Sequence, residues 1–240
     1  MNFEFNLLPV NMPALLMASI GWILLFAGIL IIYKKQDAPP KFWKVLVAGI
    51  IGLFCFTFNY QTENTMLRIP VLPLGVWILM WILKRRGTGW STYRPYAWTG
   101  FVINFVFLLT IFLTPTVHNW FYPAHEPSTY IAEVKGAEII ATHPSANERR
   151  LDAERLMEQL DTMKTSQIHS EQWYRDTYDT VGTEKVDERF PYMVEGIDTR
   201  WGSGINPLIY VENDGKGLLI RTGEGQIYFR SEQTFLKEGA

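Results

Sequence analysis

The residues most able to do chemistry in this chain are its histidines and the acidic residues near them. His118, His125 and Glu126 lie close together in the sequence, and imidazole and carboxylate groups both bind divalent metals. Their spacing matches neither a metal-binding helix nor a zinc ribbon, so we assign no metal ligand and interpret them as polar residues of an interfacial loop. The single cysteine, Cys55, excludes an intrachain disulfide and a cysteine-based metal site. The remaining histidines are His143 and His169.

Glycine-rich stretches offer no firmer catalytic or cofactor site. Gly202-Ser203-Gly204 places a serine between glycines, but it lacks the Gly-x-Ser-x-Gly spacing and the preceding apolar strand of a nucleophile elbow. Gly215-Lys216-Gly217 and Gly223-Glu224-Gly225 are typical of hairpin turns, because no helix follows whose N-terminus would bind a phosphate. We therefore assign no catalytic residue and no cofactor, and an enzyme is not the expected function.

One polar residue, Asn104, lies in the middle of the long uncharged stretch between Tyr96 and Trp120. With Thr110 and Thr114 it could line a polar path, but a hydrogen bond between helices, worth about 1 kcal/mol, is the interpretation we favour. Apolar stretches here have no ionisable residue at their centres, which argues against a stand-alone proton or ion pump.

The two halves of the chain differ in charge. Residues 1–120 contain nine of the 22 basic residues but only three of the 24 acidic residues, a formal charge of about +6. The remaining 13 basic and 21 acidic residues give residues 121–240 a formal charge of about −8. A basic, apolar half suits anionic headgroups, and an acidic half suits water. The basic loops are short and flanked by apolar sequence, so we expect no nucleic-acid binding.

Apolar stretches in the first half predict an all-α membrane domain over residues 1–122. A helix rises about 1.5 Å per residue, so about 20 apolar residues cross a hydrocarbon core of about 30 Å. The third stretch is short, with Pro70 and Pro73 near its start. We predict four transmembrane helices, over residues 13–33, 42–60, 69–83 and 96–120.

The basic residues predict the orientation of these helices. No Lys or Arg precedes the first apolar stretch, which argues against a cleaved signal peptide. Positive residues in short loops mark the cytoplasmic side. The N-terminus and residues 123–240 are therefore expected outside the cytoplasm, in a multi-pass protein of the cell membrane. The two basic loops carry Lys34, Lys35, Lys41 and Lys44, and Lys84, Arg85, Arg86 and Arg94.

Residues 123–240 are long enough for one small α+β domain. Ser145-Ala146-Asn147-Glu148 has the form of a capping box, and apolar residues then recur at helical spacing from Leu151 to Met163. We predict an amphipathic helix over residues 145–166 with a solvated charged face. A further helical turn or two is expected around the aromatic residues Trp173, Tyr174 and Tyr178.

The end of the chain predicts an antiparallel meander packed on that helix. Turn sequences at Asn213-Asp214-Gly215 and Thr222–Gly225 separate the expected strands. Thr180–Asn206 is interpreted as a loop with aromatic anchors. Ser128–Thr142 is ambiguous, because its apolar residues fit a helix imperfectly and Gly136 could instead mark a strand turn. The strands are expected at Leu208–Val211, Gly217–Arg221 and Gln226–Arg230.

This organisation favours a polytopic membrane protein that presents an extracytoplasmic binding or sensing domain. Its expected partners are the lipid bilayer and either another protein or a second copy, through the helices. The exposed face of helix 145–166 and the loop Thr180–Asn206 are the expected contact surfaces. The alternative is an accessory subunit of a membrane transport or export complex, and the third hypothesis is a surface-acting enzyme that uses the His118 region. The accessory subunit predicts that foreign helices contact the small residues Ala14, Ala18 and Gly21, and Ala48 and Gly52.

Overall fold

The computed structural model describes residues 10–61, 66–87, 89–169, 173 and 187–239 of the 240-residue chain. The chain divides into two compact units, which we describe separately. We call Pro13–His118 the helical unit, and we call Met1–Met12 together with Asn119–Ala240 the sheet unit.

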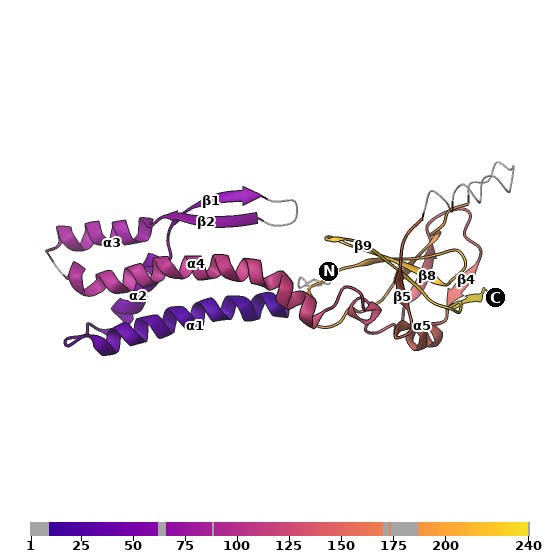
Figure 1. Ribbon diagram of the computed structural model, residues 1–240, viewed down its shortest axis with the longest axis horizontal. Coiled ribbons are helices and arrows are strands. Elements are labelled where there is room, and N and C mark those ends of the chain that lie inside the picture. The colour runs from indigo at the N-terminus through magenta and orange to yellow at the C-terminus, as the bar shows by residue number, and fades with distance from the viewer. Residues whose placement is uncertain (1–9, 62–65, 88, 170–172, 174–186, 240) are drawn as a thin grey trace, which may run out of the picture. The chain divides into compact units, whose positions relative to one another are not determined.

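The described part of the helical unit contains helices and one antiparallel β-hairpin (Figure 1). Of the helices in the described residues, α1 with 24 residues and α4 with 32 are long and apolar enough to cross a membrane. At about 1.5 Å per residue they extend about 36 and 48 Å, more than the thickness of a hydrocarbon core. The elements are α1 Met12–Lys35, α2 Phe42–Gly52, β1 Phe56–Gln61, β2 Met66–Leu72, α3 Leu74–Arg85 and α4 Trp90–Phe121.

The predicted second and third spans, residues 42–60 and 69–83, are not continuous helices. Helix α2 ends at Gly52 after 11 residues, α3 begins at Leu74 and has 12, and strands β1 and β2 lie between them. Neither helix reaches the length that crosses a bilayer. The prediction of four transmembrane helices is therefore not supported, and the described residues provide two candidates.

Local sequence explains why these helices stop. Aromatic and polar residues alternate in Phe56–Gln61, a strand pattern that hydropathy alone does not distinguish from a helix. On the returning side, Pro70 and Pro73 lack the N–H groups that a helix interior needs, so α3 begins only after Pro73. The two short helices meet where the Gly75 N–H donates to the Phe54 carbonyl at 2.7 Å.

Glycines let the backbones of α2 and α4 touch. A Cβ added at Gly52 would lie 2.1 Å from the Ala97 carbonyl oxygen, and one at Gly100 would lie 2.0 Å from that of Gly49. Both distances are shorter than any real Cβ contact, so any side chain here would push the helices apart. The buried apolar cluster beside this crossing is Leu25, Ile29, Val45, Ala48, Tyr96 and Ile103.

Several small residues that were expected to contact foreign helices pack within this chain instead. The position of a Cβ on Gly21 is 2.2 Å from the Phe107 ring of α4. Ala48 is buried, and Gly52 lies against α4 as described above. These small residues therefore pack against other helices of the same chain. Helix α4 begins six residues before its predicted start and includes Pro95 and Pro115.

The sheet unit is built on an antiparallel sheet whose described strands are ordered β3-β6-β7-β8-β9-β5. A second, two-stranded sheet pairs β4 with β10, and the short helix α5 follows β4 directly. The described strands of the larger sheet are β3 Glu138–Ala141, β5 Lys164–Ser166, β6 Tyr192–Glu195, β7 Leu208–Val211, β8 Gly217–Thr222 and β9 Gly225–Arg230. The remaining elements are η1 Pro127–Thr129, β4 Arg149–Leu151, α5 Ala153–Leu160 and β10 Leu236–Glu238.

The predicted C-terminal meander is confirmed, with strands β7, β8 and β9 in the expected order. In their register Val211 is opposite Leu218, and Leu218 is opposite Phe229, so the apolar residues of three strands share one face. All three are fully buried. Helix α5 adds Leu156 and Leu160 to the same core, as the amphipathic pattern predicts.

The predicted helix over residues 145–166 is wrong in its extent. Arg149–Leu151 and Lys164–Ser166 are strands, and only Ala153–Leu160 is helical. The helix is capped by Asp152, whose Oδ1 accepts from the Arg155 N–H at 3.4 Å.

The structure corrects the interpretation of one other stretch and assigns one that the sequence left ambiguous. Strand β6 lies inside the predicted loop Thr180–Asn206, and strand β3 occupies the end of Ser128–Thr142, after a turn at Gly136 with φ +84°. Tyr174, Tyr178 and the first part of that loop lie outside the described residues, whereas Trp173 is helical.

Candidate functional site

The metal-site hypothesis finds no support among the described residues. His118 belongs to the helical unit, whereas His125 and Glu126 belong to the sheet unit. No group of three or more His, Cys, Asp or Glu side chains in the described residues is placed to hold a metal ion.

Asn104 makes the hydrogen bond between helices that its sequence context suggests. Its Nδ2 donates to the Leu53 carbonyl at 3.2 Å, at the point where α2 ends. Thr110 and Thr114 donate back to carbonyls of their own helix, at 2.7 Å each. Asn104 therefore satisfies a carbonyl that the broken helix would leave unpaired, and the two threonines satisfy their own hydroxyls locally.

Ser203 lies in a tight turn rather than in a nucleophile elbow. Its N–H donates to the Arg200 carbonyl, and its Oγ accepts from the Ile205 N–H at 3.3 Å. The side chain is 1% exposed, so it presents no accessible hydroxyl.

The most concentrated polar chemistry lies in the sheet unit, around the buried carboxylate of Glu212. Its Oε1 accepts from Arg189 Nε at 2.8 Å, and its Oε2 accepts from the Tyr228 hydroxyl at 2.5 Å and from Arg230 Nη1. Arg230 Nη2 also pairs with Asp214 Oδ2 at 2.5 Å. A buried carboxylate is stable only when it is paired and hydrogen-bonded, and Glu212 is both.

The meander positions these groups. Glu212 directly follows β7, while Tyr228 and Arg230 are two residues apart on β9 and therefore share one face of the sheet. Strand β8 lies between β7 and β9, and it begins with Gly217. A Cβ on Gly217 would lie 2.2 Å from Glu212 Oε2 and 2.8 Å from the Tyr228 hydroxyl, so the glycine leaves room for their hydrogen bond.

The network shifts the pKa values of two of its members. Burial raises the pKa of the Tyr228 hydroxyl, and its hydrogen bond to Glu212 raises it further. Burial by itself lowers the pKa of Arg230, but hydrogen bonds with Tyr228 and Asp214 outweigh it and raise the pKa above its ordinary value. Arg230 is therefore charged at every physiological pH.

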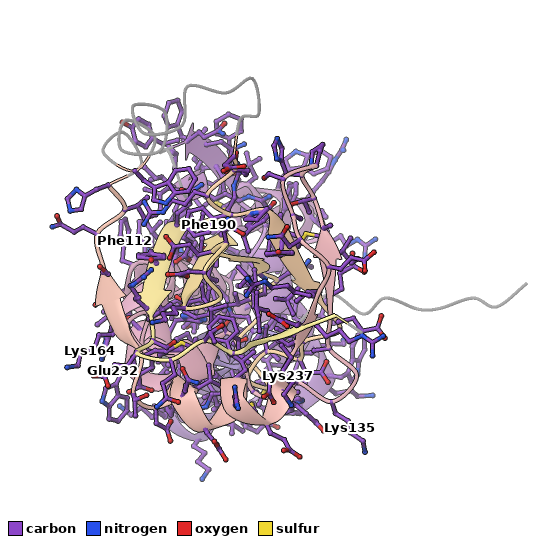
Figure 2. All side chains as sticks on the ribbon, turned by 90° about the vertical axis from the view of Figure 1, so that its right-hand side faces the viewer. Phe112, Lys135, Lys164, Phe190, Glu232 and Lys237 are labelled. Atoms are coloured by element: carbon purple, nitrogen blue, oxygen red, sulfur yellow. The ribbon has the colours of Figure 1, made fainter. Side chains whose placement is uncertain are left out.

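Arg189 is held between two aromatic rings. Its guanidinium carbon lies 5.3 Å from the centre of the Phe190 ring, which is labelled in Figure 2, and 5.3 Å from that of Tyr228. Cation–π contacts of this kind are worth about 0.5–2 kcal/mol. One terminal nitrogen of Arg189, Nη1, is buried and has no hydrogen-bond partner among the described residues.

An open cavity of about 540 Å³ adjoins this network, and we call it the arginine cavity. Three arginines and two carboxylates line it, so its formal charge is +1 with His169 neutral. Arg149 faces it from β4 and makes no ion pair with any residue that the structure describes. The described lining residues are Asn147, Arg149, Ser166, Gln167, His169, Trp173, Arg189, Glu212, Asn213, Asp214, Tyr228 and Arg230.

This arrangement suits binding better than bond-breaking. Arginine forks and amides donate hydrogen bonds to carboxylate or phosphate oxygens, and Trp173 adds an aromatic wall. A neighbouring cavity of about 570 Å³ shares Ser166, Gln167, His169 and Tyr228 with it, so a ligand longer than a single anionic group has room. The two carboxylates are both engaged by arginine, which leaves neither of them as an obvious general base.

The sequence interpretation missed this site because its members are far apart in the chain. Arg149, Arg189 and Glu212 lie on three separate elements and have no spacing in common. One signal was present: Glu212 directly follows the apolar strand Leu208–Val211, where an acidic residue is rare unless it is paired.

Comparisons of the chain with protein-family models, with curated proteins and with solved structures find no match, so the assignment of function depends on the geometry of this site and on the apolar helices.

Proposed function

We propose that this chain is a membrane-anchored binding protein whose sheet unit lies outside the cytoplasm and binds an acidic ligand in the arginine cavity. In this proposal α1 and α4 anchor the chain in the bilayer. The sheet unit presents a site for a small ligand with one or two carboxylate groups. Release and capture of that ligand would be the event that the protein senses.

The distribution of basic residues supports this orientation. Lys34 and Lys35 end α1, and Lys84 and Arg85 end α3, shortly before α4 begins. If α1 and α4 are the two crossings, the end of α1 and the start of α4 lie on the same side of the membrane, and the positive charge there favours the cytoplasmic side. The start of α1 and the sheet unit then share the opposite side.

The observation that carries the choice of ligand is the unpartnered donor on Arg189. A buried guanidinium N–H without an acceptor costs about 1–3 kcal/mol, and proteins retain such a group where something else can satisfy it. Arg149, at the same cavity, is a cation with no described carboxylate partner. An acidic ligand would supply an acceptor for Arg149 directly, and for Arg189 once the cavity wall opens to its buried Nη1.

The test compares an acid with its uncharged analogue on the full-length protein in detergent micelles. Saturation-transfer NMR should detect binding of succinate but not of succinamide, because only the acid offers charged acceptors. Arg149→Gln should weaken succinate binding about tenfold, the usual effect of losing one charge-assisted hydrogen bond. The matched control is Arg150→Gln, because Arg150 is exposed on the same strand and does not line this cavity.

Two results would contradict the proposal. One is failure of succinate to bind, or equal binding of the acid and the amide. The other is equal affinity in Arg149→Gln and Arg150→Gln. The orientation is tested separately by a reporter fused to the C-terminus that is active only in the cytosol, and we expect that reporter to be inactive.

A further inference from the structure

The loop around Trp201 contacts residues of its own unit that adjoin the start of α1 and the end of α4 in the chain. The Met12 N–H, at the start of α1, donates to the Gly202 carbonyl at 2.8 Å, and Asn11 forms an antiparallel bridge with Ser203. After the end of α4, the Tyr122 hydroxyl donates to the Trp201 carbonyl at 2.9 Å. All of these contacts are inside the sheet unit.

The backbone of this loop is fixed by a glycine. Gly202 has φ +80°, a conformation that other residues rarely adopt. A Cβ there would lie 2.6 Å from Met12 Cγ and 2.8 Å from the Tyr122 hydroxyl. The loop is therefore held in a defined position beside the ends of α1 and α4, and the direction of the neighbouring Trp201 is defined with it.

Trp201 nevertheless points away from the protein. Its side chain is 75% exposed, and that of Trp120, in the last turn of α4, is 79% exposed. Both values are high for the largest apolar side chain, which is usually well covered in a water-soluble surface. Phe121 is exposed as well, and Arg200 lies 5.6 Å over the Tyr122 ring with its own side chain exposed.

We propose that Trp201 and Arg200 form a second membrane contact, which inserts into the headgroup region of the outer leaflet beside Trp120 and Phe121. The inference depends on where the two proposed crossings end: α1 begins at Met12 and α4 ends at Phe121. Because the loop contacts the residues at or next to these two positions, both helices would leave the lipid at the level of the loop. Tryptophan favours this interfacial layer, and an exposed arginine beside it can bind lipid phosphate. The inference depends on the proposed crossing of α1 and α4.

Such a contact would add a third point of attachment to the two chain connections that join the sheet unit to α1 and α4. The sheet unit would then keep one face toward the membrane. Trp201 is about 80 residues further along the chain than Trp120, so no local sequence pattern joins the two.

The experiment measures the depth of an environment-sensitive fluorophore attached to single cysteines. On a Cys55→Ser background, NBD is attached to Trp201→Cys, to Leu109→Cys in the exposed middle of α4, and to Met157→Cys on α5, in the full chain in phosphatidylcholine–phosphatidylglycerol vesicles. We expect iodide to quench the probe at 201 about threefold less than the probe at 157. Lipids spin-labelled near the headgroup should quench the probe at 201, and lipids labelled deep in the chain should quench the probe at 109.

Each other outcome overturns the proposal in a recognisable way. Equal iodide quenching at 201 and 157 would place Trp201 in water. A probe at 201 that is shielded from both iodide and spin-labelled lipid would mean that a protein, or a second copy of this chain, covers it. If lipid quenches the probe at 109 but not that at 201, the crossing stands and only the second contact fails. If lipid quenches neither, the proposed crossing fails as well.

Discussion

The helical unit and the sheet unit are held together by different kinds of contact. In the helical unit glycines bring backbones into direct contact, and one amide, Asn104, satisfies the end of a broken helix. In the sheet unit an apolar core lies beside a buried carboxylate and its arginines. All ion pairs among the described residues belong to the sheet unit.

This difference teaches where specific binding can be built. If the helical unit crosses lipid as proposed, it gains nothing from charge, because an unpaired charge in hydrocarbon is costly. A unit in water can hold a buried ion pair whose hydrogen bonds are all made, although replacing such a pair by apolar residues is often neutral. The Glu212 network therefore contributes little net stability for its complexity, and in the proposed function its position beside the arginine cavity gives it a role in binding.

The largest effect should follow from removing the carboxylate at the centre of the network. Glu212→Ala leaves the Arg189 cation buried without its partner, which costs about 3–5 kcal/mol. Hydrogen exchange of the full-length protein in micelles should show faster exchange throughout β7–β9 and no change in α4. Glu195→Ala is the control, because Glu195 is exposed at the end of β6. Uniformly faster exchange in both units would mean that the two units do not unfold separately.

The next effect tests the helical unit in the same way. Gly100→Val places a side chain against the Gly49 carbonyl, so α2 and α4 must separate, at a cost of about 1–3 kcal/mol. Exchange should rise in α2 while β7–β9 stay protected. Gly28→Ala is the milder control, because its Cβ would meet only the Thr99 methyl group at 3.0 Å. Equal effects of the two substitutions would show that the backbone contact is less tight than the structure indicates.

A smaller effect is expected from the amide that closes the broken helix. Asn104→Leu removes the bond to the Leu53 carbonyl, and such bonds between membrane helices are worth about 0.6 kcal/mol on average. The change should appear as faster exchange at the last turn of α2 alone. Thr114→Val serves as the comparison, because Thr114 bonds only to its own helix, and it should change nothing measurable.

How much the sequence predicted also differs between the units. The strands of the meander were predicted almost to the residue, because alternation and turn chemistry are local: Asn213-Asp214-Gly215 ends one strand and permits the next. The extent of α5 was wrong because the helical apolar spacing includes Leu151, which lies in β4, and Met163, which follows α5, and only tertiary contacts decide between a longer helix and a strand. The arginine cavity joins five separate elements, and no local pattern encodes that.

In the helical unit the error had the opposite origin. Hydropathy measures how apolar a stretch is, and it does not distinguish a helix from the strand of residues 56–61. The prolines at 70 and 73 were noticed but were placed at the start of a third span, residues 69–83. The predicted orientation is insensitive to this error, because two spans and four spans both return the chain to its original side. It stays a prediction that the C-terminal reporter tests.

The smallest expected effect is a dependence of stability on pH that the sheet unit shows and the helical unit does not. Asp152 accepts from Lys237 Nζ at 2.9 Å, a residue labelled in Figure 2, and this hydrogen bond lowers the pKa of Asp152 below its ordinary value of 3.8. A lowered folded-state pKa gives stability that is fully present above the unfolded-state pKa and is lost as the pH falls through the folded-state value. Asp152→Asn should therefore speed exchange in α5 at pH 7, and the two proteins should converge as the pH falls through the lowered pKa of Asp152. The helical unit has no ion pair among its described residues, so exchange in α4 should show no such convergence. A difference between Asp152→Asn and the parent protein that stayed constant from pH 7 to pH 2 would mean that Asp152 acts only as a neutral helix cap.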